Sequence, residues 1–403
     1  MNLKNIAIVF AALFLLAINA FAGPKMEFGE GNTLELFQQV QVWDIATFDA
    51  VDSAGTSISP FNDLYIRRGR IGTKGKIFDD IFYLVSFAYD NLGKNSNTAT
   101  SGTAQADNRL FYIWDALFTW KVNPSYANIS IGYFRPQVGK ESINSAFNVN
   151  SMVKALTNYY VRSHIVGRSV GRETGANIGG LHLGDAWSLD YNLGVFTSNQ
   201  ESITGEDGYS AYPLIASRVA FTIGDPEMEK YTMSYKSNYF GKRKGLTLGL
   251  NGSYQGPTDE SYDDDSEYIG GFSHNEMAGA DFLFNWGNLN LNGEFDLLFR
   301  TLNTSSYMDM VWVGRIGYNF MLPKNFILEP VVMYSQFIGD TNSVVYDGDH
   351  GVIDGGLNWY IKENNFKINL HYAYQYGEAS SAYTADANTQ KGNFLGLGVQ
   401  LLY

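Results

Sequence analysis

The sequence predicts an all-β fold: a transmembrane antiparallel β-barrel of about sixteen strands, water-filled, with short periplasmic turns at one end and long extracellular loops at the other. Three observations predict this fold. Apolar and polar residues alternate with the period of two that is typical of strands, in one segment after another. The apolar faces are rich in Phe, Tyr and Trp, and short breaks alternate with long polar ones. Soluble sandwiches also alternate, but they lack these last two features of outer-membrane barrels.

Residues 1–22 have the features of an export signal. Lys4 supplies a positive charge, residues 6–18 form an apolar run, and Ala20-Phe21-Ala22 is a small-x-small cleavage step. The run is shorter than the roughly 20 residues that a membrane-spanning helix needs, so cleavage after Ala22 is favoured over an anchor. We expect a signal peptide at 1–22 and a single barrel domain at 23–403.

The strands follow in order along the rest of the chain. Residues 81–89, 289–299, 308–320 and 366–374 place apolar or aromatic side chains at every second position, and residues 395–403 continue the pattern to an aromatic end. The count is about sixteen, and an even number returns both chain ends to one side of a closed barrel. The candidate strands begin near Leu34, Leu64, Ile81, Arg109, Tyr126, Thr174, Trp187, Pro213, Gly245, Met277, Leu289, Met308, Phe326, His350, Phe366 and Asn393.

The connections between the strands fall into two classes. The span 224–244 is long for its side and leaves room for another hairpin, so we set the strand number at roughly 14 to 18. The short turns are at 78–80, 123–125, 184–186, 286–288, 322–325 and 362–365. The long polar loops are at 91–108, 136–173, 255–275 and 377–392.

Composition excludes several classes of protein. The 403 residues are 45% apolar and 15% aromatic, which rules out an intrinsically disordered chain. The chain has no Cys, so disulfide frameworks and thiolate metal sites are excluded. The net charge of −13 argues against nucleic-acid binding, which needs a basic surface.

The loop at 136–173 is the candidate functional loop, since a connection of this length without a strand is usually functional. It is rich in basic side chains, and its cations are Lys140, Lys154, Arg162, Arg168 and Arg172.

Several segments resemble the phosphate-selective porin O and P family of bacterial outer-membrane porins. Residues 133–142, 145–147 and 171–175 are similar to it, and residues 67–72 and 74–78 resemble its second strand and first short turn. The resemblance implies a sixteen-stranded channel in the outer membrane, commonly trimeric. It also implies that the third extracellular loop folds inward to narrow the pore and that basic side chains in the lumen conduct anions.

The positions of basic residues on the strands also indicate a water-filled lumen with basic side chains. Arg68, Arg70, Lys74 and Lys76 share one face of their strand, opposite Ile71 and Ile77. Because Arg or Lys at the bilayer midplane costs about 2–4 kcal/mol, this face is expected to line water. Arg67 has the opposite parity, so we expect it near the membrane interface.

Three further cations, Arg218, Arg315 and Lys367, also lie opposite apolar faces and are expected in the lumen. One interpretation is that they select anions. The other is that they hold the wall together by pairing with acidic residues, and the candidates for those partners are Glu294, Asp296, Asp309 and Asp354.

Two motifs are set aside. Residues 167–171 match G-x-S-x-G, but no strand-to-helix turn of an α/β sheet surrounds them, so we expect no enzyme. His371 is expected to be a hydrogen-bonded wall residue.

The acidic runs 259–267 and 347–349 could bind Ca²⁺, but neither has EF-hand spacing, and solvated loops are favoured. We expect no metal and no cofactor.

The sequence therefore predicts an outer-membrane porin that passes small hydrophilic solutes by diffusion, favouring anions or phosphate. Its expected partners are outer-membrane lipid, small anionic or hydrophilic solutes and two further copies in a homotrimer, with no nucleic acid. The alternatives are a weakly selective or sugar-favouring porin and a plugged structural or adhesive barrel. The candidate pore-lining residues are Arg68, Arg70, Lys74, Lys140, Lys154, Arg162, Arg168, Arg172, Arg218, Arg315 and Lys367.

Overall fold

The structure is a computed structural model, and it describes most of the chain after the proposed signal peptide. The signal peptide at 1–22 and the candidate residue Arg168 lie outside the described residues. The described residues are 23–29, 31–51, 56–102, 111–167, 170–197, 212–257, 261–262, 268–270, 272–302, 305–343, 347–378 and 392–403.

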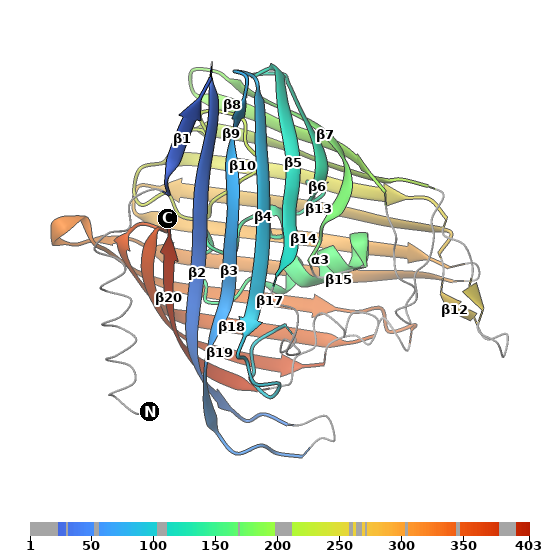
Figure 1. Cartoon of the computed structure of the whole chain (residues 1–403). Coiled ribbons are helices and arrows are strands. Elements are labelled where there is room, and N and C mark those ends of the chain that lie inside the picture. The colour runs from blue at the N-terminus through green and yellow to red at the C-terminus, as the bar shows by residue number, and fades with distance from the viewer. Residues whose placement is uncertain are drawn as a thin grey trace.

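Sixteen antiparallel strands form a closed barrel (Figure 1), as the sequence predicts. The ring closes where the first of them pairs with the last, with Val42 opposite Val399. Closure pairs the backbone groups of every strand on both edges, which a structure in hydrocarbon requires. The strands are β2 (Asn32–Phe48), β3 (Phe61–Ile77), β4 (Ile81–Leu92), β5 (Tyr112–Asn123), β6 (Ala127–Phe134), β7 (Glu173–Leu183), β8 (Trp187–Phe196), β9 (Leu214–Gly224), β10 (Lys244–Gln255), β13 (His274–Trp286), β14 (Leu289–Thr301), β15 (Ser306–Tyr318), β17 (Ile327–Ile338), β18 (Asp349–Lys362), β19 (Phe366–Gly377) and β20 (Asn393–Leu402).

Among the described residues, four short strands lie outside the ring. β1 (Lys25–Phe28) pairs with β2, and β16 (Phe320–Met321) pairs with β17. β11 (Ser261–Tyr262) and β12 (Tyr268–Gly270) pair with each other in a loop. The span between β9 and β10 contains no strand, so the further hairpin considered there is excluded.

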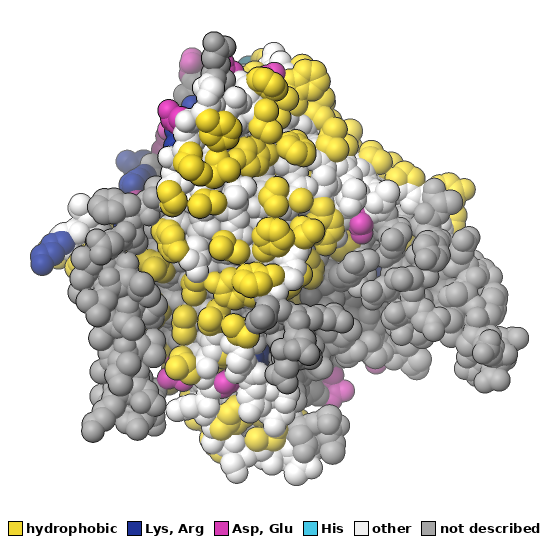
Figure 2. Space-filling view, in the orientation of Figure 1, with side chains coloured by type: hydrophobic (Ala, Val, Ile, Leu, Met, Phe, Trp, Pro, Cys, Tyr) yellow, Lys and Arg dark blue, Asp and Glu magenta, His cyan; other side chains and the backbone are white. Residues whose placement is uncertain are grey.

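The outer face of the barrel is apolar. Leu250 is 71% exposed, and Figure 2 shows hydrophobic side chains spread over the face that β2 to β5 present. Side chains of the opposite parity are polar and buried, as for Asn251 next to Leu250 and for Arg218 next to Val219. This arrangement, apolar outside and polar inside, is that of a membrane barrel and the reverse of a soluble sandwich.

The β6–β7 connection enters the barrel and carries two α-helices, α2 (Lys140–Ile143) and α3 (Leu156–Val166). No helix in the described part of the chain is long and apolar enough to cross a membrane. In Figure 1, α3 lies inside the ring, where it contacts β13, β14, β15 and β17.

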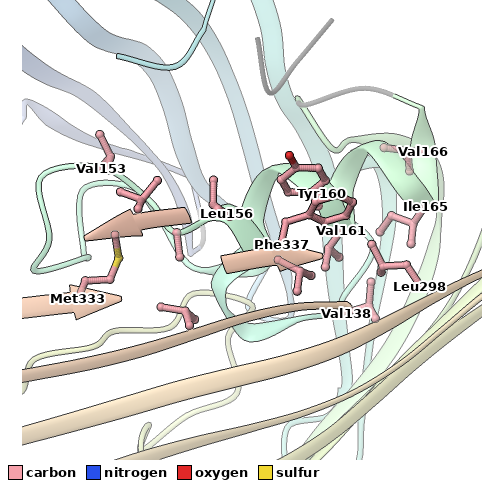
Figure 3. Packing of buried hydrophobic residues seen from close by; sticks show 14 of the residues in the cluster. Val138, Val153, Leu156, Tyr160, Val161, Ile165, Val166, Leu298, Met333 and Phe337 are labelled. Carbon is pink, nitrogen blue, oxygen red and sulfur yellow. The ribbon is translucent and has the colours of Figure 1, made fainter. Parts of the chain in front are cut away.

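An apolar core fixes the helix to this wall (Figure 3). The ring of Tyr160 stacks on that of Phe337 with centroids 3.7 Å apart. Val161, Leu298 and Met333 belong to the same buried cluster. One side of the bore is therefore filled by a dry core, which the period-two pattern alone does not predict.

A second segment enters from the opposite end, where the short turns lie. Residues 225–243 connect β9 to β10 and bury Tyr231, Tyr235 and Phe240. The hydroxyl of Tyr231 donates to Asn192 Oδ1 at 2.5 Å, and that of Tyr235 donates to Asp190 at 3.2 Å. Both acceptors are on the inner face of β8, so this connection packs against the lumen wall.

Candidate pore and its constriction

A cavity of about 1890 Å³ lies between the infolded segments and the wall formed by β2 to β6. Its lining runs from Asn365 and Tyr403 at the short-turn end to Asn91 and Gly102 at the long-loop end. Among the described residues, the cavity therefore extends along the height of the barrel. Its position opposite the dry core identifies it as the candidate pore.

The lining of the candidate pore is strongly basic. It contains ten Arg or Lys residues and three Asp or Glu residues in the part of the chain that the structure describes. The basic residues are Arg67, Arg68, Arg70, Lys74, Lys121, Arg135, Lys154, Arg162, Arg172 and Lys362, and the acidic ones are Glu35, Asp90 and Asp115. Six of the candidates from the sequence lie here: Arg68, Arg70, Lys74, Lys154, Arg162 and Arg172.

A β-bulge directs two consecutive arginines into the pore. Gln41 of β2 pairs with Arg68 and Val42 pairs with Ile66, which leaves Arg67 as an extra residue of β3. Arg67 is 5% exposed and donates to Asn91 Oδ1 at 2.8 Å. The expectation that Arg67 lies at the membrane interface is wrong, because the bulge interrupts the alternation on which it rested.

A second bulge, in β5, does the same for a tryptophan and an aspartate. Ser86 of β4 pairs with Asp115 and Phe87 pairs with Ile113, so Trp114 is the extra residue. Trp114 and Asp115 both line the pore. Bulges commonly redirect side chains at functional sites, and the sequence pattern gave no sign of either one.

Trp114 is the centre of an arginine cluster. The guanidinium of Arg70 lies 3.7 Å from the ring centroid of Trp114, and that of Arg172 lies 3.5 Å from it. Asp90 accepts two hydrogen bonds from Arg70, at 2.5 and 3.0 Å, and Asp115 accepts two from Arg172, at 3.0 and 3.4 Å. Both guanidiniums are thus held rigidly by a carboxylate and an aromatic ring.

Other cations of the pore are held by neutral groups. Arg68 donates to the side-chain oxygen of Gln41 at 2.8 Å. Arg135 donates to the carbonyls of Ser142, Ile143 and Asn144 at 3.0–3.2 Å. Neutral partners fix the position of a guanidinium without cancelling its charge, so this part of the pore stays positive.

The cations of the β6–β7 connection crowd one another. Burial, and then the charges of Arg162 and Arg172, lower the pKa of Arg135 well below its ordinary value. Burial and Arg172 also lower the pKa of Arg162 to about 9. Arg162 and Lys154 both donate to backbone carbonyls of the same connection. An anion in the pore would relieve this repulsion.

Arg135 was missed as a candidate pore residue. Its position at the loop end of β6 was the feature of the sequence that could have indicated it.

The long-loop entrance is narrowed by residues 93–102. Ser101 donates to the hydroxyl of Tyr159 at 2.6 Å, and Gln375 of β19 donates to the carbonyl of Ala99 at 2.6 Å. The β4–β5 connection therefore reaches from its own wall to the infolded loop and to β19, which lies four strands away around the ring.

Three of the remaining candidates lie away from the pore; two of them hold the infolded loop and the third pairs within the wall. Arg315 pairs with Glu141 at 3.2 Å, and Lys367 donates to the carbonyl of Val149 at 2.8 Å. Arg218 pairs with Asp281 at 2.7 Å and with Asp190 at 3.4 Å. Their expected place in the pore is corrected accordingly.

These contacts follow the wall-pairing interpretation, but the carboxylates differ from the expected ones. Glu294 instead accepts from the backbone N–H of Glu141 at 2.7 Å. Asp354 bonds to His371 Nδ1 at 2.5 Å, so the expectation of a hydrogen-bonded wall histidine is confirmed. The infolded loop supplies the partners of Arg315 and Lys367, whereas Arg218 pairs with carboxylates of the wall strands β8 and β13.

One ion pair connects the two infolded segments. Lys140 of the β6–β7 connection contacts Glu227 of residues 225–243 at 2.6 Å, and both side chains are buried. Asn144 also donates to Ser237 Oγ at 3.1 Å. The segments that enter from opposite ends of the barrel thus meet inside it and together close off the side of the bore away from the pore.

The described residues include no candidate metal site. Within the described ranges, no three His, Asp or Glu side chains are grouped so as to hold a metal ion. The acidic run 259–267 lies largely outside those ranges, as does Ser169 of the G-x-S-x-G match.

A closed sixteen-stranded barrel with an inward-folded third loop and a basic path along its wall has the architecture of an outer-membrane porin. Residues 37–219 match the model of the phosphate-selective porin O and P family, which confirms the resemblance found in the sequence. The family match and the barrel support an outer-membrane channel rather than an enzyme. No curated protein sequence matches the chain.

Solved structures share the fold at low identity. An anion-selective porin from Comamonas acidovorans aligns with a TM-score of 0.60 at 11% identity, covering 92% of this chain and 100% of that one. OmpF of Salmonella typhi gives 0.54 at 14% identity, with 94% and 100% covered. The trimer form of OmpT, an outer membrane protein of Vibrio cholerae, gives 0.54 at 10% identity, with 93% and 100% covered. These likenesses concern the fold alone.

The Lys140–Glu227 pair yields a test of the internal junction. Glu227→Gln leaves Lys140 buried without a counter-charge, and we expect it to lower the free energy of unfolding by about 3–5 kcal/mol and to raise the single-channel conductance. The matched control is Glu363→Gln, which breaks the exposed Lys242–Glu363 pair (2.5 Å). An exposed pair contributes about 1 kcal/mol or less, so the control should conduct like the parent. If the two variants had the same free energy of unfolding in denaturant titrations and the same conductance in bilayer recordings, the Lys140–Glu227 pair would not be the junction that holds the infolded segments.

Proposed function

We propose that the protein is a passive diffusion channel for small hydrophilic solutes that favours anions, phosphate among them. The observation that carries the proposal is the excess of basic over acidic side chains along the cavity that runs the height of the barrel. The name of the matching family agrees with this charge pattern.

The charge acts in two ways. Arg70 and Arg172 each have a carboxylate partner, so they contribute donors but little net charge. Arg67, Arg68 and Arg135 are held by neutral groups and keep the path positive. In a narrow pore with low-dielectric walls, such charges attract anions and their N–H groups replace part of the lost hydration.

The alternatives differ in what they require of the cavity. A plugged structural barrel needs no continuous path, and a cavity that reaches both ends speaks against it. A weakly selective porin remains the main competitor, because Asp90 and Asp115 lie within the same arginine cluster. Ion selectivity separates the two.

The reversal potential in a KCl gradient across a planar bilayer tests the proposal. We expect chloride to be favoured over potassium. Replacing both Arg68 and Arg135 with Gln should lower the permeability ratio, by roughly fivefold per charge if each contributes about 1 kcal/mol. Lys242→Gln, at an exposed site with a side chain 71% accessible, is the control and should change nothing. Potassium preference in the unaltered protein would refute the proposal.

We also propose that residues 1–22 are removed on export, that residues 23–403 form one outer-membrane barrel domain, and that three copies assemble. The fold shared with the trimer form of OmpT supports the last point only by analogy. Mass spectrometry of protein purified from outer membranes should give a chain beginning at Gly23, and its native mass should be that of three copies. A chain that still carries residues 1–22 would overturn the proposed cleavage, and a monomeric mass would overturn the proposed trimer.

A further inference from the structure

The pore has an apolar patch on the short-turn side of its arginine cluster. We define the apolar patch as Phe37, Phe82, Leu84 and Met233. All four side chains line the cavity and all four are only half-buried. They come from three parts of the chain, β2, β4 and the connection at 225–243, so the patch covers both faces of the path.

The apolar patch departs from the ordinary pattern of a porin wall, whose inward positions are polar. On β4 the inward positions pass from Phe82 and Leu84 to Ser86 and then to Asp90. Leu84 also pairs across the sheet with the inward-facing Leu117. The part of β4 nearest the short turn is thus apolar on both faces, although only one of these faces contacts lipid.

Packing explains part of the patch but leaves apolar surface facing the path. Leu84 and Met233 touch the edge of the buried core of the barrel, and yet each keeps a half-exposed side chain. Apolar surface in a concave site that also carries a few polar groups is typical of a ligand-binding site.

Positive charge lies directly beside the apolar patch. The ammonium of Lys121 is 4.0 Å from the ring centroid of Phe82. That of Lys74 is 5.7 Å from the ring of Phe37 but is paired with Glu35 at 3.0 Å, so Lys121 is the lysine whose charge faces the patch. Asp115 and its partner Arg172 follow one inward position beyond Leu84, since Ser86 pairs with Asp115. Two residues along a strand span about 7 Å, so a small molecule can reach the patch and a cation at once.

We propose that the apolar patch and the cations beside it select organic anions that carry an apolar body, such as aryl or alicyclic carboxylates, over small inorganic anions and acetate. The carboxylate binds Lys121 or Arg172 while the apolar body lies on the patch. This proposal rests on the proposed anion channel and names the class of solute for it.

Block of the chloride current through the full-length, membrane-reconstituted protein tests the inference. The probes are benzoate and cyclohexanecarboxylate, with acetate as the anion without an apolar body and benzyl alcohol as the ring without a charge. We expect the two ring carboxylates to block at concentrations about tenfold below that of acetate, as expected for partial burial of a ring. Benzyl alcohol should not block. Equal block by acetate and benzoate would overturn the inference.

A variant of the apolar patch locates the effect. Phe82→Asn combined with Leu84→Asn should reduce the difference between benzoate and acetate to about twofold or less, because the apolar contact is what produces it. The matched control is Thr119→Ser, which keeps a hydroxyl at the inward position that pairs with Phe82. A tenfold difference that survives in the double variant would place the binding site elsewhere and refute the proposal. Both results are read with the chloride preference intact, so they are distinct from a failure of the proposed anion channel.

Discussion

The fold depends on one constraint: no backbone N–H or C=O group can remain unpaired in hydrocarbon. The pairing of β2 with β20 satisfies it by removing the edges of the sheet. Once the sheet is closed, the period-two alternation of each strand assigns one set of side chains to lipid and the other to the lumen. The polar interior is therefore a consequence of closure, and everything that the lumen does follows from which inward positions are filled and which stay wet.

The buried charges serve two separate purposes on the two sides of the bore. On the filled side, Arg315 and Lys140 form ion pairs that hold the infolded segments, and Arg218 pairs with two carboxylates of the wall. On the open side, Arg68 and Arg135 are held by neutral groups and keep their charge available. The overall charge of −13 says nothing about the pore, because the sign of the path is set by a few inward positions.

Local features of the fold could be predicted from the sequence, and long-range ones could not. The sixteen strands follow from alternation, which is a property of each strand by itself. Arg67 was misplaced because a bulge, a property of two paired strands, reverses the parity of a single residue. The partner of Arg315 is Glu141, 174 positions away, and no spacing in the chain indicates such a pair. The inward course of residues 225–243 was missed for the same reason.

The central claim is that solutes pass only between the infolded loop and the wall of β2 to β6. The chain contains no cysteine, so single cysteines can be compared directly. Thr119→Cys lies on the proposed path, whereas Ser335→Cys lies behind α3, where Ser335 accepts a hydrogen bond from the N–H of Leu156 at 3.0 Å. A small anionic methanethiosulfonate reagent should modify Thr119→Cys and reduce its current, and should leave Ser335→Cys unmodified. Modification of both at the same rate would contradict the claim.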